Sequence, residues 1–206
     1  MPGDRAPLAE VEHLVGMQAQ SPGAPYVGLW TRLAAFDPLE LSDALAARAA
    51  VRMTVMRGTL HLLSARDAYL LRPVVEPLLR RAFRSSAFAK RAAGVDLGRV
   101  VAVARELLDE RPRSVAELGP ELAVALGHAD GEALAYAVRY LVPLVQVPPR
   151  GLWRRGGRAA FATLEQWLGR PADLEATDEQ MDAVVLRYLG AFGPASVEWQ
   201  MRVLRG

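Results

Sequence analysis

Two glutamines separated by a single alanine, Gln18-Ala19-Gln20, are the first residues whose types and spacing could support chemistry. Side chains two residues apart share a face on an extended segment but point well apart on a helix. Pro22 disfavours helix at Ser21, so we expect the preceding helix to run out near Gln20 and the two amides to converge. An amide does not titrate in the accessible pH range, which excludes acid–base catalysis by loss of a proton.

A converging pair of amides could orient a water molecule and place carbonyl oxygens beside a developing positive charge. Such assistance suffices only where the bond to be broken is already labile. The glycosidic bond of a cationic N-alkylated purine is of this kind, because the base departs neutral and leaves an oxocarbenium-like sugar. Gln18 and Gln20 are therefore candidate catalytic residues. The alternative is a polar helix end without a catalytic part, which the residues alone favour.

A basic stretch over residues 148–158, PPRGLWRRGGR, is a second candidate site. Its glycines allow close backbone approach, and guanidinium groups neutralise phosphates and release counterions. We interpret it as the DNA-contacting turn of a hairpin, with Arg139 on the preceding predicted helix facing the same groove. The alternative is a solvated surface hairpin with Trp153 packed inward. The candidate DNA-binding arginines of the hairpin are Arg150, Arg154, Arg155 and Arg158.

Arg57, Thr59 and His61 form a third group, at alternate positions of a predicted strand and so on one of its faces. Beside the loop that carries Gln18 and Gln20, they would make a polar pocket between a hairpin and the N-terminal helix, and they are candidate DNA-binding residues. The alternative places Arg57 at a hairpin turn and the other two side chains as satisfied polar groups near the core. We favour that alternative for His61.

The elements that must position these groups are predicted in a repeating order. Apolar spacing indicates helices over residues 8–20, 26–36 and 37–50. Residues 51–65 then alternate between apolar and polar around a central turn, which predicts a two-stranded hairpin. Three helices followed by a hairpin is the order of elements in a winged helix.

In the second half of the chain, helices are again predicted before a hairpin. Two helix N-termini are marked by the sequence. Asp37 is expected to cap the third helix, and Ser114 with Glu117 forms a capping box at a later helix. Pro73 and Pro77 should limit or kink the helix that they occupy. The later predicted elements are helices over residues 65–86, 97–110, 114–126 and 130–144, a hairpin over 145–163, and a helix starting at 178.

These patterns indicate a mainly α protein with small β-hairpins, arranged as tandem winged-helix (helix-turn-helix) modules. The third unit has room for about one helix after Pro194, so we expect a truncated or frameshifted reading frame, the alternative being a C-terminal helical cap. The predicted divisions are a first module over residues 1–66, a helical connector over 67–110, a second module with the basic wing over 111–175, and the start of an incomplete third module over 176–206.

Composition narrows the class of protein. The 206 residues are 51% hydrophobic, enough for one sizeable core or two small ones. The absence of cysteine excludes disulfides and thiolate metal sites, and the three histidines lie far apart, so we expect no metal and no other cofactor. With no signal peptide and no apolar run of membrane length, we expect a cytoplasmic protein that does not contact a membrane.

The net charge of +2 does not by itself demand a nucleic-acid partner. Lys90 is the only lysine among the 25 basic residues, and the planar fork of arginine suits phosphates and guanine edges. A GC-rich coding bias explains the overall number of arginines, however. The argument for DNA binding therefore rests on local clustering.

Four stretches of the chain, residues 16–38, 55–67, 142–157 and 186–196, match a known family in this order. They resemble the bacterial winged helix DNA-binding domain-containing family, which includes the AlkZ/YcaQ-type DNA glycosylases that unhook bulky alkyl adducts and interstrand crosslinks. The resemblance extends from about Leu8 to Ser196 and implies tandem winged helices. It also implies that Gln18-Ala19-Gln20 is the family's catalytic Gln-apolar-Gln motif.

The function implied by this resemblance is that of a monomer that binds double-stranded DNA and hydrolyses the N-glycosidic bond of bulky alkylated or crosslinked purines. Set beside this family, we expect the chain to be short at its N-terminus and to lack the rest of the third winged helix. One alternative is a non-catalytic DNA-binding protein or transcriptional regulator that uses the same wings. Another is an inactive fragment acting through protein–protein contacts of apolar residues such as Val197, Trp199 and Val203.

Overall fold

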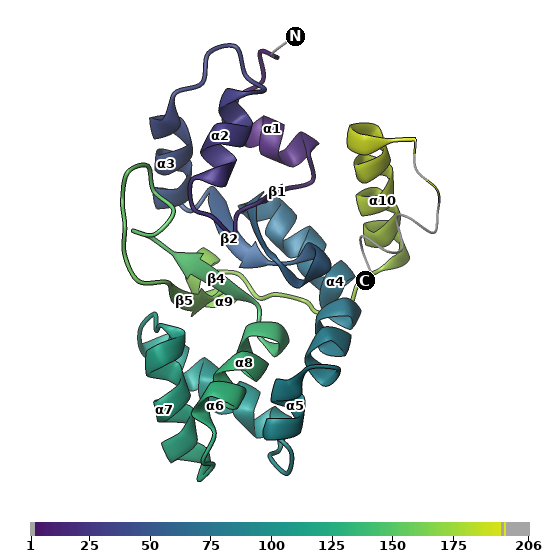
Figure 1. Cartoon of the computed structure of the whole chain (residues 1–206). Coiled ribbons are helices and arrows are strands. Elements are labelled where there is room, and N and C mark those ends of the chain that lie inside the picture. Colours follow the sequence, from purple (N-terminus) through teal and green to yellow (C-terminus); the bar gives the residue numbers. More distant parts are fainter. Residues whose placement is uncertain (1–2, 195, 197–206) are drawn as a thin grey trace.

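The computed structural model describes residues 3–194 and 196, and it confirms a mainly helical fold with one small antiparallel sheet. Helices α1–α3 lie at one end of the molecule and α5–α8 at the other, with the sheet between them (Figure 1). The described helices are α1 (Pro7–His13), α2 (Ala24–Trp30), α3 (Pro38–Ala46), α4 (Ala65–Arg84), α5 (Ala87–Arg91), α6 (Leu97–Glu110), α7 (Val115–Leu126), α8 (Gly131–Leu141), α9 (Leu164–Leu168), α10 (Asp178–Phe192) and the 3-10 turn η1 (Met56–Gly58). The strands are β1 (Met17–Gln18), β2 (Ala50–Thr54), β3 (Leu60–Ser64), β4 (Leu144–Val147) and β5 (Ala160–Thr163).

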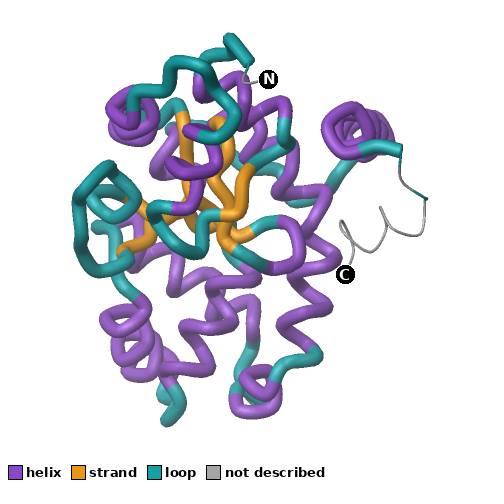
Figure 2. Tube along the Cα trace, turned by 45° about the horizontal axis from the view of Figure 1, so that its top comes forward, coloured by secondary structure: helices purple, strands orange, loops and turns teal. Residues whose placement is uncertain are grey.

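Both predicted hairpins are confirmed. Strands β2 and β3 pair antiparallel around η1, and β4 pairs with β5 around a long loop. The two hairpins also pair with each other, through Met53 of β2 and Val145 of β4, so that one sheet has the order β1-β3-β2-β4-β5. In Figure 2 the strands form a single central layer with helices around it. The predicted module boundaries remain a prediction, although the first and second modules as predicted share this sheet.

The sheet separates two hydrophobic clusters, because neighbouring residues on a strand face opposite sides. Ala50 and Leu62 pack against α1, α2 and α3. Met53 and Leu63 pack on the opposite side, against α4 and α10. A further cluster joins α6, α7 and α8 at the other end of the molecule and includes Leu122.

Local signals in the sequence set most helix ends. The Asp37 side chain accepts a hydrogen bond from the backbone of Leu39, as expected of an N-cap, and Ser114 with Glu117 forms the expected capping box. Pro73 and Pro77 do not limit the helix that they occupy, since α4 continues through both as one helix of 20 residues, and a kink at either position stays a prediction. An interior proline costs about 3 kcal/mol. The extensive burial of the α4 face offsets that cost.

Helix α10 begins the predicted third unit and packs back on the rest of the chain. Arg187 donates hydrogen bonds to both carboxylate oxygens of Asp67, at 2.8 and 2.6 Å, and to the carbonyl oxygen of Glu12 at 2.5 Å. No helix within the described residues is long and apolar enough to cross a membrane. The helix expected after Pro194 and the apolar residues Val197, Trp199 and Val203 fall outside the described residues.

Candidate functional site

The glutamine pair lies on a short extended segment at the edge of the sheet. Helix α1 ends at His13, earlier than the sequence predicted, because Val15 and Gly16 both take positive φ values, 53° and 102°. A Cβ at Gly16 would lie 2.4 Å from a Leu63 side-chain atom, so only glycine lets the chain pass this close to β3. Ala19 is fully buried, while the residues on either side of it are exposed. Both glutamine amides are therefore open to solvent.

The structure does not bring the two amides into one cavity. Gln18 lines a cavity of about 220 Å³. Gln20 lines a different cavity of about 380 Å³. Gln18 is the last residue of β1 and Gln20 lies in the bend that follows, so the two side chains border different cavities.

The Gln18 cavity also receives Arg57 and His61. His61 is 3% exposed, and its Nδ1 donates to the carbonyl oxygen of Thr59 at 2.9 Å. Burial lowers the pKa of His61, and the nearby charge of Arg57 lowers it further. His61 is thus buried and hydrogen-bonded, as the alternative interpretation predicted, and its part in DNA binding stays a prediction.

The other two members of this predicted group lie outside strand β3, which begins at Leu60. Arg57 is exposed in the η1 turn with φ 55°, and Thr59 bonds to the carbonyl oxygen of Met56 through its own hydroxyl at 3.2 Å. The polar pocket expected between the hairpin and the N-terminal helix forms with Gln18, Arg57 and His61. Thr59 is not one of its lining residues.

Two aromatic side chains of α10 complete the Gln18 cavity. Tyr188 and Phe192 line it, with ring centroids 4.8 Å apart and planes tilted by 40°. Sequence reasoning did not identify them, although aromatics four residues apart on a helix share a face. Phe192 is 44% exposed, whereas Tyr188 is buried at 9%, so Phe192 is the ring of the pair that faces solvent.

The Gln20 cavity is basic. Three of the arginines that the sequence suggested for DNA binding, Arg139, Arg150 and Arg158, line it together with Gln20. They come from α8 and from both ends of the β4–β5 loop, so sequence positions far apart meet at one place. Residues at the N-terminus of α7, Ser114, Val115 and Ala116, form another wall.

The loop between β4 and β5 is anchored on α2 and α3. It runs back along α2 and α3 in Figure 1. The Tyr26 hydroxyl donates to the carbonyl oxygen of Gly151 at 2.8 Å, and the backbone N–H of Trp153 donates to the Ser42 hydroxyl at 2.6 Å. The Trp153 ring packs on Tyr26, with centroids 5.0 Å apart, and remains 37% exposed.

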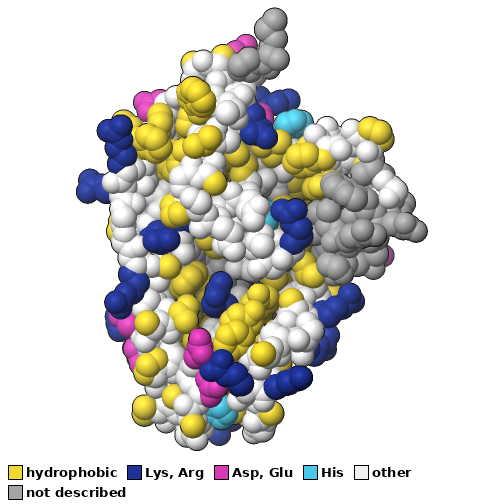
Figure 3. Space-filling model, viewed as in Figure 1, with side chains coloured by type: hydrophobic (Ala, Val, Ile, Leu, Met, Phe, Trp, Pro, Cys, Tyr) yellow, Lys and Arg dark blue, Asp and Glu magenta, His cyan; other side chains and the backbone are white. Residues whose placement is uncertain are grey.

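The remaining two candidate arginines lie on this loop outside the Gln20 cavity. Arg154 and Arg155 are both exposed, and the Arg154 guanidinium lies 5.7 Å from the centroid of the Trp153 ring. Figure 3 shows basic side chains scattered over the face in view, with fewer acidic ones among them. This surface is electrostatically suited to a polyanion.

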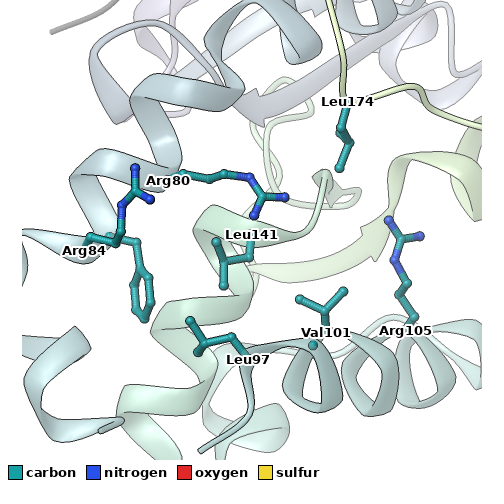
Figure 4. Close-up of a pocket in the computed structure, with 9 residues that line it drawn as sticks. Arg80, Arg84, Leu97, Val101, Arg105, Leu141 and Leu174 are labelled. Carbon is teal, nitrogen blue, oxygen red and sulfur yellow. The ribbon is translucent and has the colours of Figure 1, made fainter.

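A third cavity, of about 320 Å³, lies apart from the glutamines between α4, α6 and α8 (Figure 4). Its rim carries Arg80, Arg84 and Arg105 over an apolar floor. Arg80 is paired with Glu76 at 2.6 Å, and Arg105 with Glu165 at 3.1 Å.

Among the residues described, no group of three or more His, Cys, Asp or Glu is arranged to hold a metal ion.

Comparison with known proteins identifies the family. The model of the family "DNA glycosylase AlkZ-like" matches residues 11–201. The solved structure of Streptomyces sahachiroi DNA glycosylase AlkZ is similar in fold, with a TM-score of 0.76 at 23% sequence identity, over 98% of this chain and 55% of that one. The chain thus spans just over half the length of that glycosylase. A search of curated proteins found no match. Since the family model covers nearly all of the described residues, the chain belongs to the AlkZ-like DNA glycosylase family.

Proposed function

We propose that the chain is a monofunctional DNA glycosylase that hydrolyses the N-glycosidic bond of bulky alkylated or crosslinked purines in duplex DNA. The observation that carries this proposal is the arrangement of the glutamine motif. Ala19 is buried and holds the segment against the sheet, while Gln18 and Gln20 present their amides at two cavities of one surface. Membership of the AlkZ-like family supports the same activity.

In the proposed reaction, the alkylated nucleotide lies between the two cavities, so that the amide oxygens of Gln18 and Gln20 approach its sugar from different sides. The C1′–N bond breaks with both electrons passing to the base, which loses its positive charge and departs neutral. The carbonyl oxygens stabilise the cationic sugar, and a water molecule held by one of the two amides adds to C1′ and releases a proton to solvent. No metal or organic cofactor enters these steps.

The arginines of the Gln20 cavity bind the DNA backbone in this proposal. Arg139, Arg150 and Arg158 would each neutralise a phosphate and so release counterions. Making the target nucleotide accessible costs a few kcal/mol of unstacking, less where a bulky adduct already disturbs the stack. We propose that the protein acts as a monomer on chromosomal DNA in the cytoplasm.

The test is release of base from duplex DNA that carries N7-alkylguanine. Wild type should release the base, while Gln18→Ala and Gln20→Ala should lose most of this activity and keep their affinity for the duplex. Gln166→Ala is the matched control, since this exposed glutamine on α9 lines neither cavity of the glutamine motif. Equal release by all four proteins would contradict the assigned role of the pair.

A second candidate is a non-catalytic DNA-binding protein or regulator. The basic cavity favours it, because three arginines bind phosphates whether or not the glutamines act. The same assay separates the two functions. A regulator would bind one undamaged duplex sequence in preference to others, release no base, and bind unchanged when Gln18 or Gln20 is replaced.

A further inference from the structure

The buried side chain of Arg52 contacts both the glutamine motif and the β4–β5 loop. It lies in β2, opposite Leu62, and is 2% exposed. Its Nη2 donates to the carbonyl oxygen of Ala19 at 2.7 Å. Its Nη1 donates to the side-chain oxygen of Gln146 and, at 3.4 Å, to the carbonyl oxygen of Arg150. One guanidinium group therefore contacts both the peptide between the two glutamines and Arg150, the first arginine of the basic stretch.

The charge of Arg52 is buried without a carboxylate partner in the described part of the chain. Its interactions there are with neutral carbonyl and amide oxygens, and its Nε has no hydrogen-bond partner. Burial, together with the nearby charge of Arg150, lowers the pKa of Arg52 to about 10. A buried cation without a counter-charge costs stability, and proteins retain such groups where function requires them.

The partners of Arg52 are residues of the candidate site. Gln146 and Arg150 line the Gln20 cavity, and Ala19 joins Gln18 to Gln20. The basic turn is shaped around the guanidinium as well, since a Cβ on Gly151 would lie 2.8 Å from both Cδ and Nη1 of Arg52. Loss of this group would free two walls of the site from each other.

We propose that Arg52 is a positioning residue, whose guanidinium fixes the glutamine motif relative to the β4–β5 loop. The use of this positioning for base release rests on the proposed glycosylase function. A rigid fork with several donors is suited to holding three acceptors at once, whereas the single nitrogen of lysine is not. Displacement of catalytic groups by about 1 Å can lower a rate by about 100-fold, so the effect should appear in the chemical step.

Amide hydrogen exchange tests the positioning without any need for activity. In Arg52→Met, the segment 16–21 and the loop 148–158 should both exchange about tenfold faster than in wild type, since a hydrogen-bonded tether of each is lost. The reporting amides include Ala19, which donates to the Leu60 carbonyl oxygen at 2.7 Å, and Trp153, which donates to Ser42 at 2.6 Å. Arg72→Met is the control, because Arg72 is 1% exposed but contacts Glu76 and Tyr140 away from the motif.

Kinetics on the duplex with N7-alkylguanine supply the second measurement. Single-turnover release at saturating protein should fall by about 100-fold in Arg52→Met, while the Kd for the same duplex changes by less than about threefold. Arg52→Lys, which retains the charge, should recover only part of the rate. A general loss of stability would instead affect Arg52→Met and Arg72→Met alike.

The exchange measurements decide whether Arg52 is a positioning residue. Faster exchange in both segments of Arg52→Met, absent from Arg72→Met, supports the positioning role. Unchanged exchange, or equal changes in both variants, overturns it. If Arg52→Met is too unstable to purify, Arg52→Lys takes its place in the same comparison, because one nitrogen cannot bond Ala19 and Gln146 as the fork does. If wild type releases no base, the glycosylase proposal fails, and exchange alone still decides on Arg52.

Discussion

Gln18 lies directly across from His61 in the antiparallel register of β1 and β3, and both side chains line one cavity. The imidazole is buried, and its pKa is lowered mainly for that reason. A neutral ring therefore stands beside Gln18 at neutral pH. This matters for the proposed reaction, since a protonated histidine would oppose the positive charge that develops on the sugar.

The first prediction concerns stability against pH. Because folding holds the pKa of His61 below its ordinary value of 6.5, the unfolded chain takes up this proton first as the pH falls. The contribution of His61 to the free energy of unfolding is complete above about pH 6.5 and declines below it, by at most about 1.4 kcal/mol per pH unit. Urea unfolding from pH 8 to 5 measures this decline.

His61→Asn is the matched variant for this prediction, since the asparagine amide can still donate to the Thr59 carbonyl oxygen but does not titrate. Its unfolding free energy should vary less between pH 6.5 and 5 than that of wild type. Parallel curves for the two proteins would show that His61 is not held neutral in the fold.

The second prediction concerns the salt dependence of duplex binding. Arg150→Gln and Arg158→Gln should each reduce the log–log slope of affinity against salt by about one unit, because each arginine contacts one phosphate in the proposed complex. Arg84→Gln is the control, since Arg84 is exposed at the separate α4–α6–α8 cavity. Fluorescence anisotropy over a salt series gives the slopes. An equal loss of slope in all three variants would mean diffuse attraction rather than binding at the Gln20 cavity.

Much of the fold could be predicted because its signals are local. The capping box of Ser114 and Glu117, the N-cap at Asp37 and the helix Leu97–Glu110 all follow from residues within a few positions of one another. The pairing of Met53 with Val145 could not be predicted in this way. This contact joins two hairpins, and no residue close to either strand in the sequence indicates which strand will pair with it.

The candidate site was predictable residue by residue but not in its arrangement. The exposed amides of Gln18 and Gln20 follow from a polar-apolar-polar pattern, but their separation into two cavities depends on where β1 ends. The burial of Arg52 could not be predicted from the sequence, because a lone arginine in an alternating strand ordinarily faces solvent. Its burial depends on acceptors from Ala19 and Gln146, which only the folded chain brings together.

The third prediction concerns the fit of the basic turn on Arg52. Gly151 has φ 102°, and a Cβ there would lie 2.8 Å from atoms of Arg52, so Gly151→Ala should lower the free energy of unfolding by about 2 kcal/mol. Gly156 belongs to the same turn, but a Cβ on it meets nothing within 4 Å. Gly156→Ala should therefore change stability by less than about 0.5 kcal/mol. Urea unfolding followed by tryptophan fluorescence compares them, and equal effects would contradict a turn packed on the guanidinium.

The last prediction concerns how α10 is held over the Gln18 cavity. Asp67 is 1% exposed, and Arg187 bonds both of its oxygens, so Arg187→Met leaves a buried carboxylate without its main partner. Removing one member of a buried pair costs about 3 kcal/mol, discounted here because the Arg187 side chain is 26% exposed. We expect a loss of about 2 kcal/mol in urea unfolding.

Arg66 provides the control for this pair, because it also approaches Asp67, at 3.4 Å, from a side chain that is 70% exposed. Arg66→Met should cost less than about 1 kcal/mol, as surface ion pairs do. Since Arg187 also bonds the Glu12 carbonyl oxygen, its loss should release α10 from both α1 and α4. Hydrogen exchange in residues 178–192 should then rise in Arg187→Met and not in Arg66→Met. If exchange there stays at the wild-type rate, apolar packing of Val184 and Tyr188 is what holds α10 against the cavity, and the ion pair adds only stability.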